Sequence, residues 1–204
     1  MRTIAQIISI LFHPLLLATY LMMMVGYYFP VMLAIAPQNF KVILGFVFCF
    51  TFLLPVVNIL MFRYFGTISS VTMHERTERL VPFVAIAIIY LVMDFLFYNK
   101  LGVFANVNKL MIIVTTMVVF SAVVTFFFKV SIHSLAACGM IGILLPLNKA
   151  LENNGLLWPT AIAMVIAGLI MSARLYLNAH TFNEVLMGAF AGFSIGFAGM
   201  LIMF

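Results

Sequence analysis

The chain has 204 residues, of which 66% are hydrophobic and only 7% are charged. Soluble domains carry about 25% charged residues, so this composition excludes a soluble enzyme or binding module and makes lipid the solvent for most of the chain. The Lys and Arg residues behind the net charge of +5 lie singly in short connections, a pattern typical of membrane orientation signals. We therefore expect membrane lipid as a partner, and no nucleic acid.

Apolar runs follow one another along the whole chain, each near the ~20 residues that a helix needs to cross a bilayer. They predict spans at residues 6–29, 40–63, 82–98, 109–128, 132–148, 157–173 and 184–203. We expect seven spans, with six spans and one half-span as the alternative. Because backbone groups in lipid must satisfy one another, the predicted fold class is all-α: a polytopic transmembrane helical bundle forming a single domain, 1–204.

The first apolar run begins after Arg2 and superficially resembles a secretion signal. Its apolar stretch is long enough to span a bilayer and no small-residue cleavage site ends it, so we expect a retained first helix. His13 and Pro14 lie inside this run. The favoured interpretation of His13 is a hydrogen-bonded or kink-associated histidine.

Successive crossings sort the polar connections onto two faces of the bundle. The face that we call the motif face holds the N-terminus, residues 64–81 and the turns near Lys129 and Arg174. Most of the histidines fall on it, together with the acids and arginines that we expect to have a chemical role. These residues are His74, His133, His180, Glu78, Arg79, Arg174 and Glu184. Ionisable groups at bundle depth are costly, so this concentration predicts a functional site.

The sharpest cluster lies in residues 172–188. Arg174 is followed after five residues by His180, and Glu184 comes four positions later, where it shares a helix face with the histidine. A carboxylate on one imidazole nitrogen fixes the tautomer and frees the other nitrogen as a nucleophile or base. The guanidinium of Arg174 offers a planar fork of donors that suits a phosphate.

Two further clusters precede it. Ser131 is expected to cap an apolar helix whose first amides can bind an anion, with His133 beside them as a proton donor. Arg76 and Arg79, in the segment before the third span, would add positive charge to an anion held there.

Together these clusters resemble the motifs of the type 2 phosphatidic acid phosphatase superfamily, membrane phosphatases related to glucose-6-phosphatase and vanadium haloperoxidases. The third motif of that family reads Ser-Arg, five residues, His, three residues, Asp. Arg174, His180 and Glu184 fit this spacing, with Glu in place of Asp and Ala173 inserted after Ser172. The resemblance covers residues 74–188 and is closest to a divergent bacterial branch.

The other two motifs match less closely. Ser131 and His133 keep the Ser and His of Pro-Ser-Gly-His, but Ile132 stands where the glycine would let backbone approach phosphate. In the first motif, Lys followed after six residues by Arg-Pro, Arg79 is a loose match. Thr72 occupies the position of the Lys, for which Arg76 is a substitute.

The resemblance implies a bacterial inner-membrane phosphatase that hydrolyses a lipid phosphate or diphosphate through a phosphohistidine. His180 would attack phosphorus, oriented by Glu184, and His133 would protonate the leaving group. Four residues would hold the phosphate: Arg174, Arg79, Arg76 and Ser131. No metal or other cofactor is expected. The alternative is a non-catalytic membrane protein on the same fold that binds anionic lipid or acts in transport or as a scaffold.

Overall fold

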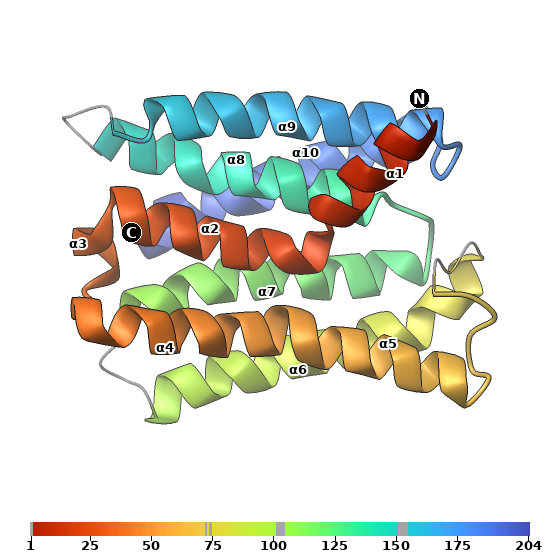
Figure 1. The fold of residues 1–204 in the computed structure, drawn as a ribbon, viewed down its shortest axis with the longest axis horizontal. Coiled ribbons are helices and arrows are strands. Elements are labelled where there is room, and N and C mark those ends of the chain that lie inside the picture. Colours follow the sequence, from red (N-terminus) through yellow and green to blue (C-terminus); the bar gives the residue numbers. More distant parts are fainter. Residues whose placement is uncertain (1, 72, 74, 101–104, 151–154) are drawn as a thin grey trace.

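The computed structural model of the chain describes residues 2–71, 73, 75–100, 105–150 and 155–204. Within these ranges every regular element is a helix, and the long helices lie side by side in one bundle (Figure 1). Among the described residues, six helices are long and apolar enough to cross a membrane, and a bent N-terminal pair makes a seventh if it is one span. The predicted all-α bundle is confirmed, and the chain is an integral membrane protein.

The first span, predicted at residues 6–29, is broken in the structure. It consists of α1 (Arg2–Leu11) and α2 (Pro14–Tyr28), which meet at an angle of 58°. A short helix, α3 (Pro30–Leu33), follows. The next span contains α4 (Pro37–Phe48), a π-helical turn η1 (Cys49–Leu53) and α5 (Leu54–Tyr64). The remaining spans are α6 (Arg76–Lys100), α7 (Ala105–Thr125), α8 (Ile132–Ala150), α9 (Leu157–Tyr176) and α10 (Phe182–Met203).

The break between α1 and α2 follows from Pro14, which has no backbone N–H to continue the helix. His13 precedes it in an extended conformation and caps α2, with Nδ1 accepting a hydrogen bond from the amide of Leu15 at 3.4 Å. We call residues Ser9–Pro14 the elbow. The interpretation of His13 as a hydrogen-bonded, kink-associated histidine is confirmed.

The tightest helix pairing joins α8 and α10. Gly188, Gly192 and Gly196 recur every fourth residue along α10, and a methyl group on any of them would collide with backbone oxygen atoms in the segment 131–139. Small residues at such spacing let two membrane helices approach backbone to backbone. The pairing places the starts of α8 and α10 next to each other, and with them the second and third motifs.

The connections segregate to the two ends of the bundle as the crossing order requires. In Figure 1 the N-terminus and the α5–α6, α7–α8 and α9–α10 connections all lie at the right-hand end, and the C-terminus lies at the left. The right-hand end is the predicted motif face, so all three motifs meet at one side of the membrane.

Candidate active site

Side chains from the three motifs surround one cavity at the motif face. Arg79, His133, Arg174 and His180, which were predicted to converge, all line it. Its volume is about 430 Å³, which lies within the range of small-ligand sites. The wall continues along α8 from His133 to Ile143, about 15 Å at 1.5 Å per residue.

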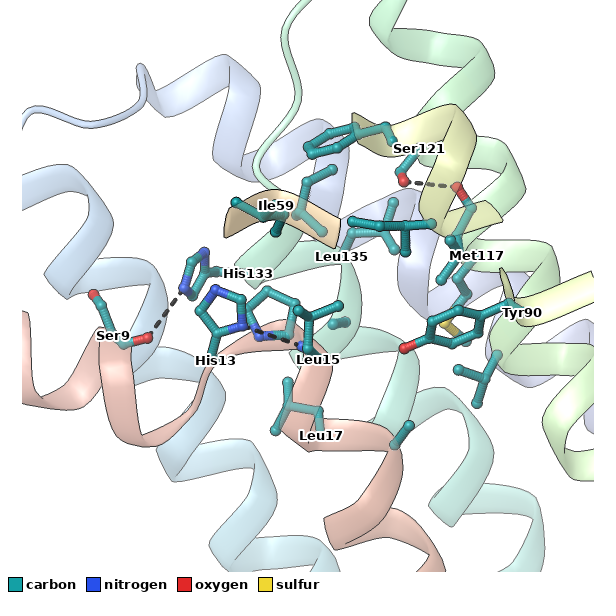
Figure 2. A pocket seen from close by; sticks show the side chains of 18 of the residues that line it. Ser9, His13, Leu15, Leu17, Ile59, Tyr90, Met117, Ser121, His133 and Leu135 are labelled. Carbon is teal, nitrogen blue, oxygen red and sulfur yellow. Dashed lines mark hydrogen bonds between the residues drawn. The ribbon is translucent and has the colours of Figure 1, made fainter. Parts of the chain in front are cut away.

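The charged and histidine side chains of the cavity lie at the motif face. Away from it the wall is mostly apolar, with side chains such as Leu17, Ile59, Met117 and Leu135 (Figure 2). Tyr90 is the polar exception, and its hydroxyl donates to the carbonyl of Thr51. An anionic head group would therefore meet the arginines and histidines, while an apolar tail would fit the part that extends between the helices.

His180 lies buried in the turn between α9 and α10, and Thr181 caps the helix that follows. Oε2 of Glu184 lies 2.6 Å from Nδ1 of His180, the contact that the four-residue spacing predicted. A carboxylate only accepts hydrogen bonds, so Nδ1 carries the proton and Nε2 keeps the lone pair that a nucleophile needs.

The surroundings of His180 keep its ring neutral. Burial lowers its pKa from the ordinary value of 6.5; the hydrogen bond to Glu184 raises the pKa, and the charges of Arg79 and Arg174 lower it. At pH 7 the ring is therefore uncharged, which is the nucleophilic form of an imidazole.

Two arginines bring positive charge to the polar end of the cavity. Arg174, in the last turn of α9, has a buried Nε atom with no hydrogen-bond partner among the described residues. Arg79 is only 7% exposed, and its Nε donates to the carbonyl of Met73 at 2.8 Å. This bond orients the guanidinium at the polar end of the cavity.

His133 lies in the first turn of α8 and contacts the elbow. Its Nε2 lies 3.2 Å from the carbonyl oxygen of Ser9, and its ring packs edge-on against that of His13 with centroids 5.5 Å apart (Figure 2). Because a carbonyl can only accept, Nε2 is the donor, and a proton for a leaving group must come from Nδ1.

Ser131 is the helix cap that the sequence predicted, but it does not line the cavity. It is fully buried, and its hydroxyl lies 2.9 Å from that of Ser134. Its amide donates to the carbonyl of Glu184 at 3.1 Å, which ties the start of α8 to the start of α10. Ile132 and His133 do line the cavity, and their first-turn amides lack acceptors within the helix.

Arg76 lies away from the cavity. Its Nη1 donates to the carbonyl of Thr125 at 3.2 Å and also to that of Phe126, at the end of α7. These are carbonyls that a helix C-terminus leaves unpaired, so Arg76 acts as a cap in this structure. Thr72 and His74, the other first-motif positions, lie outside the described residues.

Ser9 and His13 were not predicted to belong to the site, yet both line the cavity. The available signal was a histidine followed by proline inside an apolar run. That pair predicts a helix break near the motif face, but only the packing of α1 and α2 against the other helices shows which way the ring points.

A comparison with protein families identifies the chain. Residues 80–204 match the PAP2 superfamily. The chain belongs to this superfamily. The matched segment includes His133, Arg174, His180 and Glu184, and Arg79 immediately precedes it. Members of the superfamily are phosphatases, which supports a general phosphoester hydrolase. No curated protein and no solved structure gives a significant match to the chain.

Proposed function

We propose that the protein is a bacterial inner-membrane phosphatase that hydrolyses a lipid phosphate or diphosphate. The observation that carries the proposal is the shape of the cavity, with arginines and histidines at the motif face and an apolar wall that continues about 15 Å along α8. This arrangement suits an amphiphile with a phosphorylated head. Superfamily membership supports the reaction type.

The proposed mechanism begins with His180. Its Nε2 attacks phosphorus as the bond to the leaving oxygen breaks, and the resulting positive ring is stabilised through Nδ1–H by Glu184, 2.6 Å away. Arg174 and Arg79 hold the phosphoryl oxygens, and the amides of Ile132 and His133 add donors at a helix N-terminus.

His133 completes the cycle in this proposal. In its protonated form it gives the proton on Nδ1 to the leaving oxygen, while Nε2–H stays on the Ser9 carbonyl. The neutral His133 then accepts a proton from water as the water oxygen attacks phosphorus and the bond between phosphorus and His180 breaks. Every step uses side chains of this chain and water.

One observation favours the alternative of a non-catalytic protein that binds anionic lipid. Two of the four residues expected to hold phosphate, Ser131 and Arg76, are engaged in helix caps. A site with fewer phosphate donors would still bind an anionic head group but would stabilise a transition state less.

The test is phosphate release by purified protein from lipid phosphates and from soluble alkyl phosphates with tails of increasing length. Burial of each added methylene stabilises the complex by about 0.8 kcal/mol, so kcat/KM should rise about fourfold per carbon while the tail still lengthens within the cavity. His180→Ala should abolish release. Activity that ignores tail length would contradict the lipid substrate, and no activity on any substrate would favour the non-catalytic alternative.

A further inference from the structure

The elbow delivers polar groups of the N-terminal helices into the cavity. Because Pro14 has no N–H, the carbonyl of Ile10 is left without its helical donor and accepts the amide of His13 instead, at 3.2 Å. The carbonyl of Ser9, which that amide would have bonded in a continuous helix, is thereby free to accept from Nε2 of His133. The break thus docks the elbow directly on the second motif.

The same break fixes the tautomer of His13. Its Nδ1 accepts the amide of Leu15, so this nitrogen carries the lone pair and the neutral ring must carry its proton on Nε2. A ring that caps the N-terminus of α2 is also disfavoured as a cation by the helix dipole. His13 is therefore built as a neutral donor rather than as an acid.

Figure 2 shows His13 and His133 side by side in the cavity, although 120 positions separate them in the sequence. Arg174 and His180 line the same cavity. Ser9 adds a second polar group: the residue lines the cavity and is only 6% exposed, and its buried hydroxyl has no hydrogen-bond partner among the described residues. The Ser9 hydroxyl and the Arg174 Nε are thus two buried groups beside this cavity without a partner among the described residues, and a bound anion would satisfy both.

We infer that His13 is a further phosphate-contacting residue, whose neutral Nε2–H donates a hydrogen bond to a non-bridging oxygen of the phosphoryl group bound between Arg174 and His180. The inference rests on the proposed function. A neutral imidazole at a helix N-terminus can polarise a substrate oxygen in this way without giving up its proton. The elbow then contributes to the site from outside the segment that matches the superfamily.

The experiment compares His13→Asn with His13→Gln in the full-length protein. Asn keeps an acceptor at the position of Nδ1 and so retains the cap on α2, but its amide is too short to replace Nε2–H. Gln places an amide donor near the position of Nε2 and weakens the cap. The measurements are kcat/KM for phosphate release from a soluble alkyl phosphate, the melting temperature in detergent, and the affinity for orthovanadate.

His13→Asn should keep the melting temperature and lose about 10²–10³-fold in kcat/KM, as expected when a transition-state donor is removed. His13→Gln should melt earlier yet stay within about tenfold of the wild-type kcat/KM. An active wild type with an unimpaired His13→Asn, or with both variants equally impaired, would overturn the inference and leave the proposed function standing.

If the wild type releases no phosphate from any substrate, orthovanadate binding separates failure of the proposed function from failure of the inference about His13. The proposed function then fails, whereas the inference about His13 survives if His13→Asn weakens vanadate binding about tenfold or more and His13→Gln does not. Equal vanadate affinities in the three proteins, or no vanadate binding at all, would overturn the inference as well.

Discussion

Two parts of the site are held in very different ways. The α8–α10 pair brings the second and third motifs together through backbone packing at Gly188, Gly192 and Gly196 and through the hydrogen bond from the Ser131 amide to the Glu184 carbonyl. The elbow touches the same site through one hydrogen bond to His133 and one ring contact. The outward side chains of α1 are largely exposed in the isolated chain and would face lipid.

The difference separates stability from chemistry. A backbone contact between helices has no side chain that can rearrange, so the geometry of His180 depends on the fold of the whole pair. The elbow contacts the site through the Ser9 carbonyl and the His13 ring, so a side-chain change there alters what the cavity offers a ligand with little effect on the bundle. Substitutions that disturb the backbone packing of α8 and α10 should therefore lower both stability and activity. Side-chain substitutions in the elbow should lower activity with little change in stability.

The largest effect is expected where the rigid pair itself is broken. Gly192→Leu would drive a side chain into the backbone of Leu135 and force the two helices apart. We expect a loss of more than about 3 kcal/mol in the free energy of unfolding, with activity lost in parallel. Gly168→Leu is the matched control, because a Cβ atom there meets nothing within 4 Å. Melting curves in detergent measure both, and similar curves for the two variants would refute the close approach.

The second-largest effect is expected at Glu184, the residue of α10 that contacts Nδ1 of His180. Glu184→Gln keeps a hydrogen-bond acceptor near Nδ1 but removes the charge that stabilises the positive ring. We expect kcat for phosphate release to fall about 10⁴-fold, as when the acid of a catalytic triad is neutralised, while the melting temperature stays near that of the wild type. Asn183→Gln, at an exposed position on the same turn, is the control. A wild-type rate in Glu184→Gln would remove Glu184 from the mechanism.

The third effect lies where the two parts meet. His133→Ala removes the proposed acid and should slow release of an alkyl leaving group about 10²–10⁴-fold. An aryl phosphate needs little protonation of its leaving oxygen, so it should rescue His133→Ala and leave His180→Ala inactive. The variant also loses the bond to Ser9, at a cost of about 1 kcal/mol in stability. Failure of the aryl substrate to rescue His133→Ala would point to a structural role for this ring.

The smallest effect concerns pH. Burial lowers the pKa of His180 below 6.5 in the folded protein. The hydrogen bond to Glu184 opposes this decrease, and the charges of Arg79 and Arg174 add to it. His180 therefore stays neutral and nucleophilic at pH values somewhat below 6.5. The loss of kcat/KM at acid pH should have its midpoint below pH 6.5. The unfolded chain binds more protons in this window, so stability should also decrease as the pH falls below 6.5.

A pH–rate profile of the wild type and of His133→Ala checks the assignment. The acid limb should survive in His133→Ala because it belongs to His180, whose ionisation is set mainly by its own burial. An acid limb above pH 6.5 would mean that His180 is not the titrating nucleophile.

The sequence predicted the local contacts of the α8–α10 part, because their signals are local. The spacing of His180 and Glu184 within one helix turn determines their contact, and Ser131 before an apolar run determines a cap. The residues of the first motif were harder to place. Arg76 and Arg79 are three residues apart on one chain segment, yet only Arg79 reaches the cavity, while Arg76 is drawn to the end of α7.

By itself the sequence determined that this chain is a helical membrane protein with its histidines and arginines on one face. Composition and the lengths of apolar runs suffice for that, since lipid allows few ways to satisfy a backbone. Only the tertiary structure decided that the first span bends by 58° at His13 and Pro14, and that the bend joins His13 and Ser9 to His133 and the remainder of the cavity. Such a contact spans more than a hundred residues of chain and depends on the packing of α1 and α2 against the bundle, which no local pattern encodes.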